Sequence, residues 1–572
     1  MKKLLRYLDG YKKYLFLGPL FKLLEAIFEL IVPLVTAKII DTGIYNNDNV
    51  YIRKMSFIII LLGISGLIFA LTCQFFAAKC AYGFGTVLRK ALYKHINSLS
   101  HSEVDKLGTS TLITRLTNDT NAVQTGINML IRLGTRTPFL IIGATIMAIS
   151  LDLRLSLIFL VTAPLIAFIV YKIMSKTIPM YKQNQKRLDR ISLLTNENLE
   201  GVRVIRSFSR QQEEINEFNQ ASNDLCMHSV MVGKISAILN PVTFMIMNLS
   251  AACVIWFGGL RVNVGDLTQG EITAFVNYIT QISLALIVLA NLIVFFNKAL
   301  AGANRISDIL DISPSLDDGN EYIDPDKNHP VLEFENVCFR YAGAAEDSVS
   351  NISFKLNKGE MLGIIGGTGS GKTTVANIIP RFYDVTSGEI RIYGKNIKNI
   401  RLDQLRKFIR TVPQRVSVIS GTVAENIRMG KKNATDEEIT DALKTAQAYE
   451  FIQKIPDNIN APVLQGGKNF SGGQKQRITI ARAVVSSPQI LILDDSTSAL
   501  DLATDFRLRK AISEKLRDTI VIMISQRATS LKNADKILVL EDGRCAGFGT
   551  HDELCQSCEV YKEIVEIQKA GE

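Results

Sequence analysis

The pattern of apolar positions changes near the middle of the chain. Spanning a membrane takes a helix of about 20 mostly apolar residues. Apolar stretches of that kind predict six transmembrane helices, at residues 14–40, 55–82, 134–152, 154–174, 233–260 and 272–298. From Val331 onward, short β-rich runs punctuated by glycine are typical of a soluble α/β domain. We therefore expect a membrane α-helical domain at 1–310, a linker at 311–330 and an α/β domain at 331–572.

The segments between the predicted helices indicate an orientation. Two long segments, 83–133 and 175–232, alternate with three short ones, so the long segments lie on one side of the membrane. Residues 175–210 carry three acidic residues and eight basic ones: Lys176, Lys182, Lys186, Arg187, Arg190, Arg203, Arg206 and Arg210. Such an excess is typical of cytoplasmic segments. The sequence thus predicts a multi-pass protein of the cytoplasmic membrane, surrounded by membrane lipid, with both termini cytoplasmic. This basic excess accounts for part of the net charge of +10, so we expect no nucleic-acid partner.

Charged residues near the N-terminus lead to two further expectations. Residues 1–8 alternate basic and apolar residues, which is typical of an amphipathic helix lying on the membrane surface. Lys22, Glu25 and Glu29 then fall on one face of the first predicted span, where Lys22 can pair with Glu25. Charges at membrane depth usually face a bundle interior or a wet cavity. The three residues therefore line a substrate cavity, form a structural ion pair, or lie outside the hydrocarbon zone of the membrane.

The soluble half contains a phosphate-binding loop. An apolar strand, Met361–Ile365, runs directly into the pattern GxxxxGK[ST], after which a helical pattern begins. The loop residues are Gly366, Gly367, Thr368, Gly369, Ser370, Gly371, Lys372, Thr373 and Thr374. Backbone N–H groups of such a loop cradle phosphates, the lysine reaches the β- and γ-phosphates, and the threonine hydroxyl binds Mg²⁺. A second apolar strand ends at Asp494, the carboxylate expected to hold the Mg²⁺ from the other side.

The segment Asn469-Phe-Ser-Gly-Gly-Gln-Lys-Gln-Arg477 precedes that second strand. With this segment, the chain resembles an ABC exporter half-transporter (type IV fold) over nearly its whole length. The resemblance implies ATP and Mg²⁺ as cofactors and a coupling role for the segment 197–208. It also assigns site roles: Tyr341 stacks on adenine, Gln414 joins the Mg²⁺ site to the membrane domain, Ser471, Gly472, Gly473 and Gln474 form the signature, and Asp501 ends the D-loop.

The same resemblance implies that two half-transporters pair head to tail. Each ATP then lies between the phosphate-binding loop of one chain and the signature of the other. A serine hydroxyl and glycine N–H groups at a helix N-terminus suit a γ-phosphate. One chain alone therefore has no complete site.

Two positions depart from the family pattern. Active sites of the family follow the Mg²⁺-binding aspartate with glutamate, whereas this chain has Asp495, and they carry histidine after the next strand, whereas this chain has Gln526. Aspartate is one methylene shorter, so its carboxylate is set back by roughly 1 Å, a displacement that can cost about 10²-fold in rate. Glutamine hydrogen-bonds a phosphate but carries no positive charge and relays no proton. ATP binding should survive these replacements, and hydrolysis should be strongly impaired.

An intact signature beside an impaired site favours one assembly. We expect this chain to be the degenerate-site subunit of a heterodimeric multidrug-type exporter, whose partner carries the catalytic glutamate and histidine. A small lipophilic or drug-like compound is the expected substrate. Two alternatives stay open: a homodimeric lipid flippase that hydrolyses ATP slowly with Asp495, and an ATP-gated or regulatory subunit that does not pump.

Overall fold

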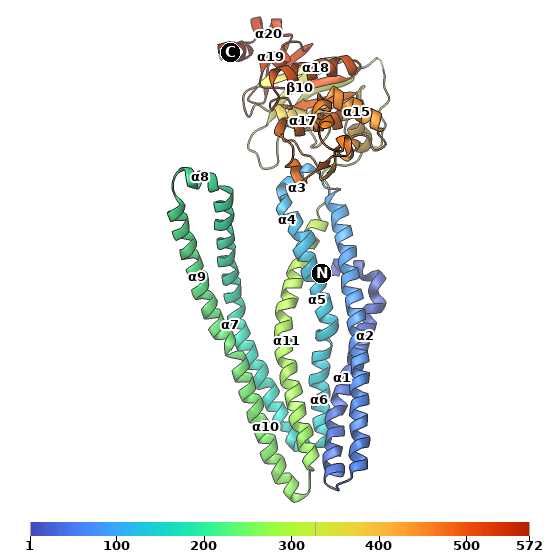
Figure 1. The fold of residues 1–572 in the computed structure, drawn as a ribbon, viewed down its shortest axis with the longest axis vertical. Coiled ribbons are helices and arrows are strands. Elements are labelled where there is room, and N and C mark those ends of the chain that lie inside the picture. Colours follow the sequence, from blue (N-terminus) through green and yellow to red (C-terminus); the bar gives the residue numbers. More distant parts are fainter. Residues whose placement is uncertain (1, 327, 571–572) are drawn as a thin grey trace. The chain divides into compact units, whose positions relative to one another are not determined.

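The computed structural model describes residues 2–326 and 328–570, and the chain divides into two compact units (Figure 1). The first, called here the membrane unit, comprises the residues up to Asn97 together with Ser110–Ile312. The second, the soluble unit, comprises Ser98–Thr109 together with the chain from Ser313 onward. A short piece of the long segment between the second and third predicted spans therefore folds with the soluble half.

The described residues of the membrane unit form helices joined by short turns, with no strand among them. Its elements are η1 (Lys2–Tyr11), α1 (Lys12–Lys38), η2 (Ile39–Ile44), α2 (Asn49–Ile96), α4 (Thr109–Thr114), η3 (Arg115–Asp119), α5 (Thr120–Met129), η4 (Leu130–Gly134), α6 (Arg136–Leu151), α7 (Leu153–Glu200), α8 (Val202–Ser207), α9 (Gln211–Ala237), α10 (Leu239–Val264) and α11 (Gln269–Leu310). Helices lie at all six predicted spans, and several continue far beyond them.

Five helical stretches of the described chain are long and apolar enough to cross a membrane. They are Asn49–Ile96, Thr109–Leu151, Leu153–Glu200, Gln211–Val264 and Gln269–Leu310, which contain the second to sixth predicted spans. Helix α1 covers the first predicted span but is not among the five, since Lys22, Glu25 and Glu29 interrupt its apolar residues. Its role as the sixth span stays a prediction.

The charges of α1 are paired within the membrane unit. Lys22 Nζ lies 2.6 Å from Glu25 Oε2, which confirms the predicted pair, and both side chains are mostly buried. Glu29 Oε2 lies 2.6 Å from Arg136 Nη2 at the start of α6, so it joins two helices. These pairs meet the requirement that a charge at membrane depth has a partner.

The N-terminal helix differs from expectation in what covers its apolar side. Residues Lys2–Tyr11 form a 3₁₀ helix, η1, in which Leu4 and Leu8 are 2% and 4% exposed. Lys3 Nζ also pairs with Asp311 Oδ2 at 2.8 Å. Because the helices of the unit already cover Leu4 and Leu8, these side chains are not free to enter a lipid surface.

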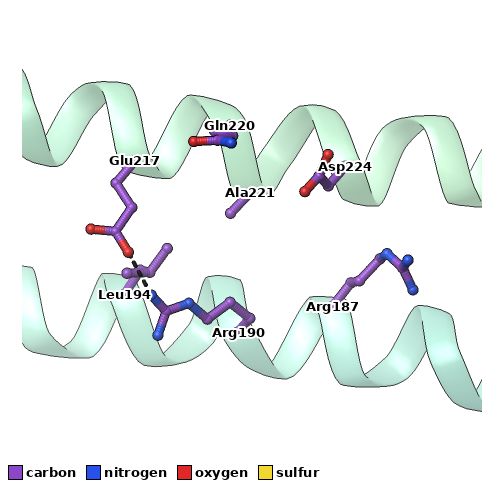
Figure 2. Close-up of a pocket in the computed structure, with 7 residues that line it drawn as sticks. All are labelled: Arg187, Arg190, Leu194, Glu217, Gln220, Ala221 and Asp224. Carbon is purple, nitrogen blue, oxygen red and sulfur yellow. Dashed lines mark hydrogen bonds and ion pairs between the residues drawn. The ribbon is translucent and has the colours of Figure 1, made fainter.

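Helices α7 and α9 run side by side and are joined through α8 (Figure 1). Figure 2 shows the groove between them, of about 210 Å³, with charged side chains from both helices. Arg190 Nη2 of α7 lies 2.5 Å from Glu217 Oε1 of α9, and about half of each side chain is exposed. An exposed pair of this kind contributes at most about 1 kcal/mol. The groove is therefore a solvent-exposed contact between two helices.

The described residues of the soluble unit form three sheets. Antiparallel strands in the order β2-β1-β4-β5 form the first, strands in the order β12-β11-β3-β10-β9-β6 form the second, and β7 pairs with β8. The strands are β1 (Leu332–Phe339), β2 (Val349–Leu356), β3 (Met361–Gly366), β4 (Ser387–Ile392), β5 (Lys395–Asn396), β6 (Ile409–Val412), β7 (Gly421–Thr422), β8 (Pro462–Val463), β9 (Ile490–Asp494), β10 (Ile520–Ile524), β11 (Lys536–Glu541) and β12 (Arg544–Gly549).

Helices pack around these sheets and enclose two apolar clusters. They are α3 (His101–Leu107), α12 (Lys372–Ile378), α13 (Leu402–Phe408), α14 (Val423–Arg428), α15 (Asp436–Thr445), α16 (Tyr449–Gln453), α17 (Gly472–Val484), α18 (Leu502–Lys515), α19 (Ala528–Leu531), α20 (His551–Ser557) and α21 (Glu559–Ala570). Strands β3 and β10 are apolar throughout, and β9 is apolar up to Asp494 at its end, as expected for parallel strands buried on both faces.

Candidate functional site

The six-stranded sheet brings the candidate residues to one edge. Ile524, at the end of β10, pairs with Ile364 of β3 on one side and with Asp494 of β9 on the other, and both pairings are parallel. The carboxyl ends of the three strands therefore meet. Ligands of α/β sheets bind outside these carboxyl ends. The phosphate-binding loop after β3, Asp494 and the segment after β10 thus share one edge.

The loop after β3 has the backbone that a phosphate cradle requires. Gly369 and Gly371 have φ of +84° and +93°, which other residues rarely adopt. A Cβ at Gly371 would also lie 2.5 Å from the carbonyl oxygen of Ser348. At Gly366, a Cβ would lie 2.1 Å from the carbonyl oxygen of Leu540. Glycine at these positions is therefore a steric requirement of the loop.

Lys372 is held inside this loop. Its Nζ donates to the carbonyl oxygens of Gly366 and Gly367, at 3.0 and 2.5 Å, and to Ser370 Oγ at 3.3 Å. The residue is 9% exposed. Burial lowers the pKa of Lys372, and the carboxylates of Asp495 and Asp494 oppose that shift. The loop thus surrounds the ammonium group of Lys372, and the contact of this group with the β- and γ-phosphates stays a prediction.

Thr373 and Asp494, the two residues predicted to bind Mg²⁺, are hydrogen-bonded to each other. Thr373 Oγ1 donates to Asp494 Oδ1 at 3.3 Å, and Asp494 is 3% exposed. Burial raises the pKa of Asp494, the bond from Thr373 lowers it, and the charge of Asp495 raises it further. A buried carboxylate beside a second one is the setting that a cation stabilises. Hydroxyl and carboxylate oxygens are ligands that suit Mg²⁺, so these residues fit the ion.

Asp495 lies next to this pair on a strained backbone. Its φ is +45°, and its N–H donates to the carbonyl oxygen of Ile524 at 3.0 Å. Gln414 Nε2 donates to Asp495 Oδ2 at 3.4 Å, so the structure brings Gln414 to Asp495. Burial raises the pKa of Asp495, while the bond from Gln414 and the charge of Lys372 lower it. A role of Gln414 as a Mg²⁺ ligand stays a prediction.

Gln526 follows β10 with its side chain exposed. The buried Ser525 precedes it, and the N–H of Ser525 donates to the carbonyl oxygen of Ile364 at 3.2 Å, which ties the segment to β3. The segment after β10 therefore begins beside the strand that carries the phosphate-binding loop.

Tyr341 belongs to an aromatic group beside α12. Its ring meets Phe339 and Tyr383 edge to face, with centroids 4.8 and 5.4 Å apart, and its hydroxyl lies 3.4 Å from Thr374 Oγ1. The half-buried ring is thus fixed next to the first turn of the helix that follows the loop. Stacking of this ring on adenine stays a prediction.

The signature residues begin a different helix, α17. Ser471 caps it: the N–H of Gln474 donates to Ser471 Oγ at 3.4 Å, and the N–H of Ser471 donates to Gln474 Oε1 at 2.9 Å. Gly472 is exposed and a Cβ there would have no neighbour within 4 Å, whereas a Cβ at Gly473 would lie 3.1 Å from the carbonyl oxygen of Ala499. The N-terminus of α17 is open to an incoming group.

Asp501 has a local role in the structure. Its Oδ1 accepts from the N–H of Thr504 at 2.9 Å and so caps α18. The backbone and side-chain hydrogen bonds of Thr504 lower the pKa of Asp501. Its predicted place in the D-loop of a nucleotide site is untested.

Helix α3 is a contact that the sequence pattern does not reveal. The His101 ring stacks on Phe382 with centroids 4.5 Å apart, and Tyr383 Oη donates to Asp105 Oδ2 at 2.6 Å. A signal for the helix itself exists, because Ser100 and Glu103 form a capping box. Nothing in the sequence shows that Phe382 and Tyr383, far along the chain, receive it.

The packing of α3 predicts a pH effect. Burial and the charge of Arg406 lower the pKa of His101, and Asp105 opposes them. The unfolded chain therefore binds this proton more readily, so folding stability should decrease as the pH falls below the ordinary histidine pKa of 6.5. We expect His101→Phe, which keeps a stacked ring, to lose less stability than the native chain between pH 7.5 and 5.5. Thermal unfolding of both chains measures the difference, and equal losses would contradict the prediction.

Comparison with known proteins agrees with this architecture. Residues 15–286 match the family described as ABC transporter transmembrane region, and residues 349–498 match the family described as ABC transporter. The chain is 37% identical over 568 residues to the uncharacterized ABC transporter ATP-binding protein YfiB of Bacillus subtilis (strain 168). The aligned region covers 99% of this chain and 98% of YfiB. It is also 31% identical over 586 residues to a second protein of the same strain, named putative multidrug export ATP-binding/permease protein YgaD. That alignment covers 99% of each chain.

A solved structure shares the fold. A bacterial Atm1-family ABC exporter with ATP bound superposes with a TM-score of 0.83, over 98% of this chain and 100% of the exporter, at 22% sequence identity. At that identity, the likeness describes the fold alone. The matched families and the 37% identity to YfiB go further. On these grounds, this chain belongs to the ABC transporter family, as a half-transporter that joins one transmembrane region to one ATP-binding domain.

Proposed function

We propose that this chain is the degenerate-site subunit of a heterodimeric ATP-driven exporter. ATP-driven transport itself follows from the family. The observation that carries the finer proposal is Asp495 beside an otherwise complete phosphate and metal site, with Gln526 at the position of the family's histidine. The groups that bind ATP are present, whereas the groups that hydrolyse it are replaced.

The geometry around Asp495 supports impaired hydrolysis. A catalytic base must lie within hydrogen-bond reach of the attacking water. The carboxylate of Asp495 is one methylene short of the glutamate that the family uses, and its Oδ2 already accepts a bond from Gln414. Gln526 offers an amide where a charged or proton-relaying ring would stand. ATP bound at this loop should therefore stay unhydrolysed for long periods.

The open signature supports a partner with a competent site. Ser471 and the exposed Gly472 present a hydroxyl and N–H groups at the start of α17, which suits a γ-phosphate bound by another chain. The intact signature of this chain completes the ATP site of a partner that carries the catalytic glutamate and histidine. The partner is thus a second, different half-transporter.

Substrate and location complete the proposal. We place the protein in the cytoplasmic membrane, surrounded by lipid, with both termini cytoplasmic, because the basic residues of 175–210 mark that side. Lipophilic or drug-like compounds are the proposed substrates, which agrees with the multidrug-export name of YgaD. Mg²⁺ is the proposed metal at Thr373 and Asp494.

The purified chain alone tests this assembly. We expect it to bind ATP with Mg²⁺ but to release almost no phosphate, because no complete, competent site forms from two copies of it. Fluorescent-ATP binding and phosphate release measure the two properties, and Lys372→Ala, which removes the buried ammonium group of the loop, is the control for binding. Robust turnover by the isolated chain would contradict the heterodimer.

A further inference from the structure

The C-terminal helix, α21, is firmly attached to the soluble unit. Tyr561 is fully buried and Val565 is 8% exposed. Tyr561 Oη also lies 2.7 Å from His551 Nδ1 of α20. Positions 561, 565 and 568 are four and three residues apart, so they lie on one face of the helix. The buried face of α21 therefore carries Gln568 as its next residue.

Gln568 uses both ends of its amide on one loop. Its Nε2 donates to the carbonyl oxygen of Gln526 at 2.6 Å, and its Oε1 accepts from the N–H of Ala528 at 2.8 Å. The amide nitrogen donates to a carbonyl oxygen and the amide oxygen accepts from an N–H group, so an uncharged side chain satisfies both backbone groups. Ala528 begins α19, whose first N–H groups have no partner within the helix. Gln568 thus caps α19 and also binds the carbonyl group of Gln526, two residues before the helix begins.

The rest of the loop is fixed from the opposite side. The N–H of Ser525 donates to Ile364 in β3 at 3.2 Å, and the N–H of Arg527 donates to Ser525 Oγ at 3.0 Å. Each residue from 525 to 528 thus has at least one hydrogen-bonded backbone group, while the Gln526 side chain stays exposed. The backbone sets where that side chain points.

We propose that Gln568 is a positioning residue for this chain's ATP site. By clamping the backbone at 526 and 528, it lets α21 fix the place of Gln526 at the γ-phosphate end of the nucleotide. This inference rests on the proposed function, in which Gln526 stands in place of the family's histidine, the residue that contacts the γ-phosphate. Movement of α21 would release the loop, so the C-terminal helix controls how tightly this site retains ATP.

Hydrogen exchange of the purified full-length chain tests the clamp itself. Gln568→Met keeps the length of the side chain but removes both bonds. We expect the Ala528 amide to exchange about tenfold faster, as the loss of a hydrogen bond predicts. Glu566→Gln, on an exposed position of the same helix, is the matched control and should change nothing. Unchanged exchange in Gln568→Met would overturn the proposal.

The release of fluorescent ATP and ADP in the presence of Mg²⁺ tests the consequence. Gln568→Met should release the ATP analogue about three- to tenfold faster, as one lost contact predicts, and leave ADP release unchanged, because the loop reaches only the γ-phosphate. Gln526→Ala should act in the same way, and the double variant should add nothing, because both changes remove one interaction. Equal effects on ATP and ADP would overturn the positioning role.

A third variant separates positioning from general loss of packing. In Gln568→Glu, the side chain can accept from Ala528 but cannot donate to Gln526 until it is protonated. ATP retention should therefore recover as the pH is lowered, whereas Gln568→Met should show no such recovery. No recovery in Gln568→Glu would count against the clamp. Phosphate release measured on the same samples reports separately whether the proposed lack of hydrolysis holds.

Discussion

Transport by the assembled protein should be lost when Ser471→Ala is combined with Gly472→Asp. A Cβ at Gly472 meets nothing within 4 Å, so the structure accommodates the new side chain. A carboxylate at a helix N-terminus is also favourable in the absence of nucleotide. Against a γ-phosphate at roughly 4 Å, however, like charges repel by roughly 4 kcal/mol at an effective dielectric constant near 20. That repulsion should prevent closure over the partner's ATP, as measured by substrate uptake into inverted vesicles.

Two controls make the result specific. Thr435→Ala removes an equivalent capping box, formed with Glu438 at the start of α15, and should leave transport intact. Lys372→Ala weakens only this chain's own site, which scarcely turns over in our proposal, so it should slow transport without abolishing it. If Lys372→Ala is the more damaging change, hydrolysis occurs at this chain's own loop and Asp495 is not disabling.

Much of the site is predictable because its signals are local. The loop from 366 to 374 lies between a strand and a helix whose patterns are read within a few residues, and the second apolar strand ends at Asp494. The bond between Thr373 and Asp494 confirms that the two segments meet. Parallel strands bring their carboxyl ends to one edge, so the pairing needs no knowledge of other contacts.

Other features depend on which distant segments meet. The hydroxyl of Tyr383 donates to Asp105 of α3, 278 positions earlier, and the amide of Gln568 donates to the carbonyl oxygen of Gln526, 42 positions earlier. No periodicity or motif encodes either contact. The N-terminal helix illustrates the same limit: the sequence predicts an apolar side containing Leu4 and Leu8 but cannot identify whether lipid or protein covers it. The sequence pattern predicts which side of a helix is apolar, but tertiary packing determines which segment covers that side.

Hydrolysis at this chain's own loop should increase about 10²-fold when Asp495→Glu is combined with Gln526→His. Asp495 already lies beside Asp494 and accepts a bond from Gln414, so one more methylene moves an existing carboxylate toward the water that attacks the γ-phosphate. The glutamate carboxylate at position 495 can act as the general base and accounts for most of the increase in rate, since general-base catalysis is typically worth about 10²–10⁴-fold. The histidine restores a ring that can carry charge. Phosphate release is measured with the partner's catalytic glutamate removed, so that the partner's site is silent.

The neighbouring carboxylate provides the matched control for that experiment. Asp494→Glu adds the same methylene to a residue that is 3% exposed and bonded to Thr373. There the extra length displaces the oxygen proposed to hold Mg²⁺, so it should reduce ATP hydrolysis and weaken the dependence of ATP binding on the metal. Faster ATP hydrolysis with Asp495→Glu and slower hydrolysis with Asp494→Glu would show that the length of the side chain at position 495 limits the reaction. If neither Asp495→Glu nor the double variant gains activity, the block lies in the partner's signature, and the chemistry proposed for Asp495 and Gln526 is wrong.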